Sequence, residues 1–194
     1  MHPIDILPTM PLTEPRRLRP LRRAEYDQLV EFGVFANEKI ELLQGGLVPM
    51  SPQGSRHAFM VQVLTRVLIR QLGDRAWVRV QLPFAASDIS EPEPDLAVMP
   101  PGDYHDEHPA RALLVIEVAD SSLREDRDLK SPIYAAAGVP EFWLIDVNAE
   151  TVTVYRNPDG ASWTEMKRHN REETLALASF PDVIIALPEL FPRR

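Results

Sequence analysis

Cysteine is absent from this 194-residue chain, as are long apolar runs and an excess of positive charge. Without cysteine there is neither a disulfide framework nor a thiolate metal site, which excludes zinc fingers and fits a cytoplasmic protein. No apolar stretch reaches the roughly 18 to 20 residues that cross a bilayer. The first residues lack the basic start and apolar stretch of a secretory signal. We therefore expect a soluble, cytoplasmic protein without a membrane partner.

The net charge is acidic, −8 from 21 Lys and Arg against 29 Asp and Glu. Non-specific binding to nucleic acid usually comes from a clearly basic surface, so a DNA coat protein is disfavoured. A nuclease stays compatible, because it can gather acids around a metal and keep local basic patches. The basic run Arg16–Arg23 is one such patch or a solvated N-terminal arm, and we favour the arm.

The organisation is that of one folded unit behind a proline-rich start. Four prolines within the first fifteen residues predict an extended or disordered lead-in over 1–20. The remaining residues, 21–194, are enough for one domain with a real core and too few for two.

Apolar periodicity predicts the order helix, hairpin, helix, three strands, helix, strand and further strands. Gly45-Gly46 is the expected hairpin link, and Ser55 is the expected cap of the first long helix. The expected helices lie at 22–32, 57–72 and 124–137, and the expected strands include KIELLQ, LVPMS, WVRVQLPFAAS, PDLAVMP, ALLVIEVAD, EFWLIDV, TVTVYR and SWTEMKRH. The apolar tail DVIIALPELF is expected to dock on the body.

Glu117 interrupts the apolar run ALLVIEVAD, which has the pattern of a strand buried on both faces. An ionised carboxylate is rarely buried without a partner, because the loss of hydration costs several kcal/mol or raises its pKa. Glu117 is therefore expected to face a cation, a proton or a hydrogen-bond donor.

Asp95 is expected at the start of the preceding strand, after the stiff segment Pro92–Pro94. Alone it would be an ordinary loop acid. Two neighbouring strands that each present an acid at the same sheet end would place two anionic ligands a few Å apart, which repel unless a cation or proton lies between them. Oxygen ligands without cysteine favour Mg²⁺ or Mn²⁺.

Lys130 lies on the helix that leaves the same strand end, thirteen positions after Glu117. Its amine could fold back over the two acids, and a metal with a lysine beside a phosphate is a known catalytic arrangement. The alternative is a solvated lysine that pairs with Asp126. Asp126 could also hold Lys130 in place, and Ser121 or Ser122 could cap this helix. Tyr134 could belong to the core or reach the site, and we favour the core.

These residues carry a resemblance to a known family. The PD of PEPDLAV, the segment VIEVADSS and the run from Asp126 through GVPEFWLID to Asp146 resemble the Uma-type restriction endonuclease family of the PD-(D/E)XK nuclease superfamily. The likeness extends from about residue 22 to 191, and GVPEFWLID is its most specific part.

The resemblance implies an α/β (α+β) fold with a restriction endonuclease-like αβββαβ core, a mixed central sheet flanked by helices. It also implies a divalent metal on Asp95 and Glu117, with Lys130 as the catalytic lysine. In the superfamily the lysine usually lies two residues after the strand acid, where this chain has Ala119, so the resemblance moves that role to the helix.

Three further residues complete the candidate site. Many superfamily members add a glutamate from the first core helix, but the helix over 57–72 has no acid, so Glu41 in the KIELLQ strand is the substitute candidate. His57 could orient a phosphate or a ligand, or simply cap its helix. The main-chain carbonyl of Val118 is the third expected metal ligand.

The leading hypothesis is a metal-dependent endonuclease that hydrolyses DNA phosphodiester bonds. A second is a catalytically weak or inactive relative that acts as a binding or scaffold protein, because the charge is acidic, the helix glutamate is missing and the lysine is displaced. A third is a purely structural Glu117 bonded to His57 or Lys130. A homodimer is expected by analogy with nucleases that cut both strands.

Overall fold

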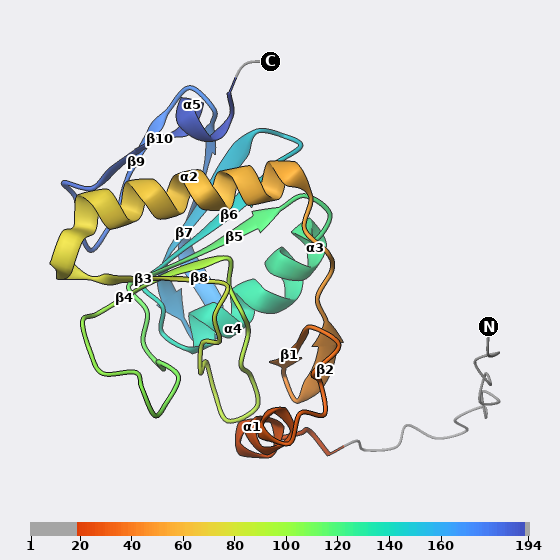
Figure 1. The fold of residues 1–194 in the computed structure, drawn as a ribbon. Coiled ribbons are helices and arrows are strands. Elements are labelled where there is room, and N and C mark those ends of the chain that lie inside the picture. Colours follow the sequence, from red (N-terminus) through yellow and green to blue (C-terminus); the bar gives the residue numbers. More distant parts are fainter. Residues whose placement is uncertain (1–18, 193–194) are drawn as a thin grey trace, which may run out of the picture.

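A six-stranded mixed sheet forms the centre of the protein (Figure 1). The computed structural model describes residues 19–192. The strand order is β3-β4-β5-β6-β7-β8, in which β5 and β6 are parallel and the other neighbours are antiparallel. The strands are β3 (Trp77–Val80), β4 (Leu96–Met99), β5 (Leu114–Ala119), β6 (Glu141–Asp146), β7 (Thr151–Asp159) and β8 (Ser162–Asn170).

The two faces of this sheet carry separate apolar clusters, which explains the unbroken apolar pattern of β5. Alternate side chains of a strand point to opposite faces. Ile116 and Val118 lie in the cluster that packs against α2 (Ser55–Leu72), whereas Val115 and Ala119 lie in the cluster with Tyr134. All six residues of β5 are buried, Glu117 among them.

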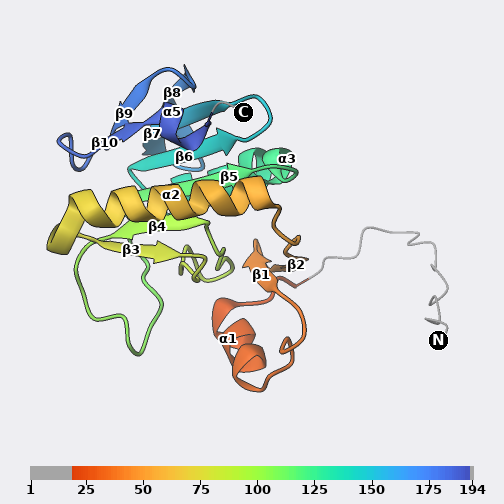
Figure 2. The same cartoon turned by 45° about the horizontal axis from the view of Figure 1, so that its top comes forward.

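One face of the sheet is covered by α2 and by the C-terminal segment. The α2 helix runs along the sheet, with β9 (Thr174–Ala176), β10 (Ile184–Ala186) and α5 (Leu187–Leu190) beside it (Figure 2). The predicted docking of the tail is confirmed, since its apolar side chains join the same cluster. The predicted cap is wrong: α2 begins after Gly54 with no side-chain cap, and Ser55 is already helical.

The other face is covered by a helical segment in three parts. It consists of α3 (Leu123–Glu125), a π-helical turn over Asp126–Lys130, and α4 (Ser131–Ala136). This agrees with the helix predicted over 124–137, although the sequence did not indicate the π turn. With α2, the three strands β3–β5 and β6, it completes the expected αβββαβ order.

The N-terminal helix and hairpin lie at the opposite end of the molecule from β9, β10 and α5 (Figures 1 and 2). They are α1 (Arg23–Glu31), β1 (Ile40–Leu43) and β2 (Gly46–Pro49). The hairpin turn is Gln44-Gly45 rather than Gly45-Gly46, because Leu43 pairs with Gly46. Both turn residues have positive φ, and a Cβ on Gly45 would lie 2.2 Å from the Cβ of Pro20.

The predicted lead-in falls almost wholly outside the described residues, as does the first part of the basic run. Within residues 19–192, Arg19 pairs with Glu25, and Arg23 lies within ion-pair distance of Asp27 and Glu91. No helix in this part of the chain is both long and apolar enough to span a bilayer.

Candidate metal and phosphate site

A polar cleft of about 340 Å³ lies where the hairpin, the start of α2, β4, β5 and the π turn meet. Every side chain predicted for the site lines this cleft, although the segments that carry them lie far apart in the sequence. The predicted residues in its wall are Glu41, His57, Asp95, Glu117, Val118 and Lys130. The structure therefore brings the whole predicted set together, while the roles of its members stay predictions.

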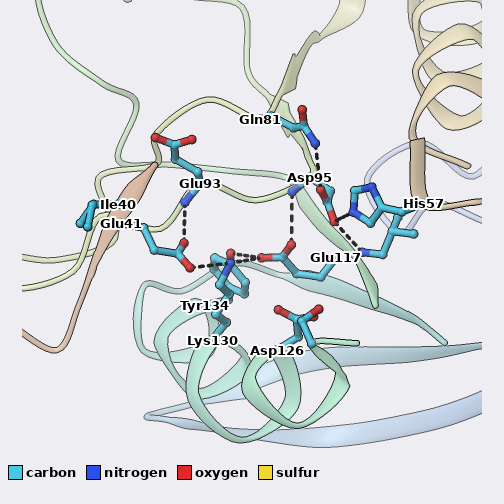
Figure 3. Close-up of polar contacts among 12 residues, drawn as sticks. Ile40, Glu41, His57, Gln81, Glu93, Asp95, Glu117, Asp126, Lys130 and Tyr134 are labelled. Atoms are coloured by element: carbon cyan, nitrogen blue, oxygen red, sulfur yellow. Dashed lines mark hydrogen bonds and ion pairs between the residues drawn. The ribbon is translucent and has the colours of Figure 1, made fainter. Parts of the chain in front are cut away.

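Two hydrogen bonds link Asp95 to β5, one to the carboxylate of Glu117 and one from the main chain of Val118. Asp95 directly precedes Leu96, the first residue of β4. Because Leu96 pairs with Ile116 in antiparallel register, Asp95 lies beside Glu117 on β5. The amide of Asp95 donates to Oε2 of Glu117 at 3.2 Å, and the amide of Val118 donates to Oδ2 of Asp95 at 2.9 Å. Figure 3 shows the two carboxylates side by side, as the strand-end argument predicts.

Glu117 faces a lysine and a tyrosine. Its Oε1 accepts a hydrogen bond of 2.6 Å from the hydroxyl of Tyr134 and lies 3.4 Å from Nζ of Lys130. Burial raises the pKa of Glu117 well above its usual range, opposed by the charge of Lys130 and reinforced by Asp126 and Asp95. A buried acid with other acids around it binds a proton or a cation more readily than an isolated one.

Lys130 bridges Glu117 and Glu41, whose Oε1 lies 3.0 Å from its Nζ. Burial alone would lower the pKa of Lys130, but Glu117, Glu41 and Asp126 outweigh it and raise the pKa, so the amine is an ammonium ion. Burial raises the pKa of Glu41, whose other oxygen accepts the amide of Glu93 at 3.1 Å. Glu41 therefore reaches the cleft from the hairpin. This placement is compatible with its predicted role as the substitute for a glutamate on the first core helix.

The π turn aligns the residues of the third segment with the cleft. In an α-helix, residues four apart drift around the axis, because a turn takes 3.6 residues. A π turn takes up more residues and offsets that drift. Asp126, Lys130 and Tyr134, each four positions from the next, are consequently all buried on the side that meets the acids.

His57 and Gln81 hold the other acid. Nε2 of His57 lies 2.9 Å from Oδ2 of Asp95, and the side-chain Nε2 of Gln81 donates to Oδ1 at 3.2 Å. Of the two partners considered for Glu117, Lys130 contacts it and His57 contacts Asp95 instead. His57 is therefore placed to orient a site acid.

Asp126 bonds to a serine. The hydroxyl of Ser122 donates to its Oδ2 at 2.5 Å, so this serine contacts Asp126 where a helix cap was expected. Burial raises the pKa of Asp126 to about 6, although the charge of Lys130 and the hydrogen bond from Ser122 both lower it. Asp126 acts on Lys130 through its charge.

Sequence reasoning missed the contact of Gln81 and favoured the core over the site for Tyr134, which belongs to both. Tyr134 is a core residue, as predicted, and also binds Glu117; its spacing of four from Lys130 was the available signal. Gln81 has φ +52 in the loop after β3, and no sequence pattern indicated that its amide would reach Asp95.

The donor set suits a hard divalent cation. Carboxylate oxygens of Asp95 and Glu117 and the carbonyl of Val118 are the ligands that Mg²⁺ and Mn²⁺ accept. Across residues 19–192 no three Asp, Glu or His side chains form a ready-made cage. Mg²⁺ does not require one, since it usually binds one or two carboxylates and completes its shell with water and substrate phosphate. The residues present therefore fit the ion that the resemblance implies.

Comparisons with known proteins agree with the sequence resemblance. The Uma2 family model, described as "Putative restriction endonuclease", matches residues 23–188. A solved structure, titled as a putative nuclease belonging to DUF820 from Anabaena variabilis, is similar with a TM-score of 0.71 at 19% identity, covering 89% of this chain and 98% of the other. At that identity the likeness shows a shared fold. Among curated proteins there is no match.

Proposed function

The chain belongs to the Uma2 family of restriction endonuclease-like proteins, and from this premise we propose that it is a metal-dependent endonuclease that hydrolyses DNA phosphodiester bonds. The observation that carries the proposal is the charge balance of the cleft. Glu117, Glu41 and Asp126 act on the ammonium group of Lys130, and Asp95 lines the same cleft beside Glu117. This surplus of buried negative charge is suited to a divalent cation.

The side chains would divide the work as follows. Asp95, Glu117 and the carbonyl of Val118 hold a Mg²⁺ or Mn²⁺ ion, and His57 and Gln81 keep Asp95 in its orientation. Such an ion polarises a phosphoryl oxygen and lowers the pKa of bound water. Lys130 forms ion pairs with Glu41 and Glu117, and its ammonium group would also stabilise negative charge on the phosphate.

Glu41 sets the position of Lys130. The two acids on either side of the ammonium hold it at a fixed place between the hairpin and β5. A lysine contributed by the helix can in this way do what the superfamily usually assigns to a lysine on the strand itself.

DNA as the substrate rests on the family, and a homodimer stays a prediction by analogy with nucleases that cut both strands. The acidic net charge favours a substrate bound locally at the cleft over extended non-specific binding. Arg124 in the cleft wall is a basic side chain within reach of a phosphate backbone.

A cleavage assay tests the proposal. The purified chain is incubated with supercoiled plasmid and with linear single-stranded DNA, in Mg²⁺, in Mn²⁺ and in a chelator. We expect metal-dependent nicking that is lost in Glu117→Gln and in Lys130→Met and kept in Arg168→Gln, a change on the exposed β8 strand. Cleavage that persists in the chelator, or in Glu117→Gln, would contradict the proposal.

An inactive relative that binds DNA or a partner is the second candidate. The observation that favours it is the closed hydrogen-bond network, in which every carboxylate oxygen of Asp95 and Glu117 already accepts a protein donor. If the chain binds DNA but binds no Mn²⁺ at Glu117 and cleaves neither substrate, this second candidate replaces the first.

A further inference from the structure

Tyr134 is a buried residue with an uncharged polar group, and this group contacts an acid of the cleft wall. It is 0% exposed, and its hydroxyl donates to Oε1 of Glu117 at 2.6 Å. Its ring lies between Phe84 and Phe142, with centroid distances of 6.3 and 5.3 Å. The packed ring leaves the hydroxyl little freedom, so the hydrogen bond has a fixed direction.

The two oxygens of Glu117 are held from opposite elements. The hydroxyl of Tyr134 on α4 donates to Oε1. The main-chain N–H of Asp95, directly before β4, donates to Oε2. Figure 3 shows Tyr134 and Lys130 meeting Glu117 on the side away from Asp95. A carboxylate fixed at both oxygens presents its remaining lone pairs in one orientation.

The neutral hydroxyl of Tyr134 and the ammonium of Lys130 have different effects on the charge of Glu117. Lys130 offsets the charge of Glu117, whereas a tyrosine donor orients the carboxylate and leaves its negative charge for a ligand. Partners of this kind, which bind a metal ligand and not the metal, typically change affinity 10–100-fold when removed.

We propose that Tyr134 is a positioning residue that fixes the carboxylate of Glu117 for cation binding. The inference rests on the proposed metal site and adds a residue to it. It concerns the hydroxyl alone, because the ring serves the apolar cluster whatever the hydroxyl does.

Calorimetry of Mn²⁺ binding with Tyr134→Phe tests this inference. Tyr155→Phe is the matched control, since Tyr155 packs against the same Phe142 and the change deletes the same atom. We expect Mn²⁺ affinity to fall 10–100-fold in Tyr134→Phe and to stay within twofold in Tyr155→Phe. Thermal unfolding of both variants is measured alongside, because a merely structural hydroxyl would lower the Tm and leave affinity unchanged.

Fluorine NMR of the native chain gives a second readout that does not depend on the folding of Tyr134→Phe. The chain contains four tyrosines, so 3-fluorotyrosine labelling gives four signals, and Phe variants at 26, 104 and 155 assign the fourth by elimination. We expect Mg²⁺ to shift the Tyr134 signal most.

Equal Mn²⁺ affinity in native protein and Tyr134→Phe, or a Tyr134 signal unmoved by saturating Mg²⁺, would overturn the inference while the metal site stands. If the native chain binds neither ion, the proposed metal site fails and the inference fails with it. The two failures are thus told apart by the native protein alone.

Discussion

Glu117 and Glu141 lie on the adjacent strands β5 and β6, are 3% and 0% exposed, and have opposite surroundings. Glu141 is met only by donors. Its Oε1 accepts from the indole of Trp143 at 3.0 Å and from the guanidinium of Arg156 at 2.6 and 2.9 Å, and its Oε2 accepts the amide of Ala178 at 2.8 Å. One acid with one cation and four donated hydrogen bonds is a closed structural unit.

Glu117 is met by donors and by other acids. Asp95 and Asp126 raise its pKa, and Glu41 shares its lysine. Glu117 also lines a cleft, whereas Glu141 links β6 to β7 and to the segment before β10. Burial alone therefore does not distinguish the two acids. Glu117 differs from Glu141 in the acids around it and in the cleft beside it.

Glu141→Gln gives the largest expected loss of stability. It leaves the guanidinium of Arg156 without its carboxylate, and breaking a buried pair costs about 3–5 kcal/mol. Urea denaturation should show this drop in the free energy of unfolding, with Mn²⁺ affinity of the folded fraction unchanged. A drop below about 1 kcal/mol would mean that Glu141 is not the structural partner described above.

Lys130→Met is expected to cost about 3 kcal/mol at pH 8, because Glu41 and Glu117 lose their cation. Lys130 lowers the pKa of both acids, so without it both pKa values rise further. An acid whose pKa is higher in the folded than in the unfolded state lowers the free energy of unfolding at high pH, where it is ionised. At low pH it is protonated and this cost disappears. The loss should therefore shrink at pH 5, as urea denaturation at both pH values would reveal; a loss independent of pH would contradict the pairing.

Glu91→Gln sharpens the comparison with a third buried acid. Within residues 19–192 its Oε2 accepts no hydrogen bond and lies 3.8 Å from the guanidinium of Arg23. Burial and the charge of Asp27 raise its pKa to about 7 from 4.5, with Arg23 opposing. Native stability is then full below about pH 4.5 and falls as pH rises to about 7. The variant should gain about 2 kcal/mol at pH 8 and nothing at pH 4.5. Equal gains at both pH values would rule out this titration.

Glu117→Gln should change stability least, by about 1 kcal/mol or less. The change removes one of the acidic groups near Lys130, and Lys130 retains its ion pair with Glu41. The hydroxyl of Tyr134 can still donate to the side-chain amide oxygen of the glutamine. Its unfolding curve, set beside that of Glu141→Gln, measures the contrast directly. A loss as large as that of Glu141→Gln would show that Glu117 too is a structural acid.

Most of the fold could be predicted from apolar periodicity and glycine positions, because each buried face of the sheet repeats in the sequence. The predicted hairpin turn was wrong by one residue, because two adjacent glycines are also compatible with a tight turn. The observed pairing of Leu43 with Gly46 places the turn at Gln44-Gly45. The predicted cap, Ser55, was also wrong by one residue. Gly54 occupies the N-cap position in an extended conformation and has no side chain to reveal that role in the sequence.

The site was predictable where it follows from strand ends and less so where it follows from loops. Asp95 and Glu117 meet because antiparallel neighbours bring the start of one strand to the end of the other. The bond from Tyr134 depends on the π turn, and the bond from Gln81 depends on an irregular loop. Neither the π turn nor the loop has a periodic signature, so the sequence did not indicate the contact of Gln81 and allowed the contact of Tyr134 without deciding it.

Mn²⁺ binding by calorimetry, comparing the native chain with Glu117→Gln and using Glu141→Gln as the buried-acid control, tests the central claim most directly. We expect saturable binding in the native chain, no binding in Glu117→Gln, and native affinity in whatever fraction of Glu141→Gln is folded. Binding that survives Glu117→Gln, or absence of binding in the native chain, would contradict the claim that the charge surplus around Glu117 is a metal site.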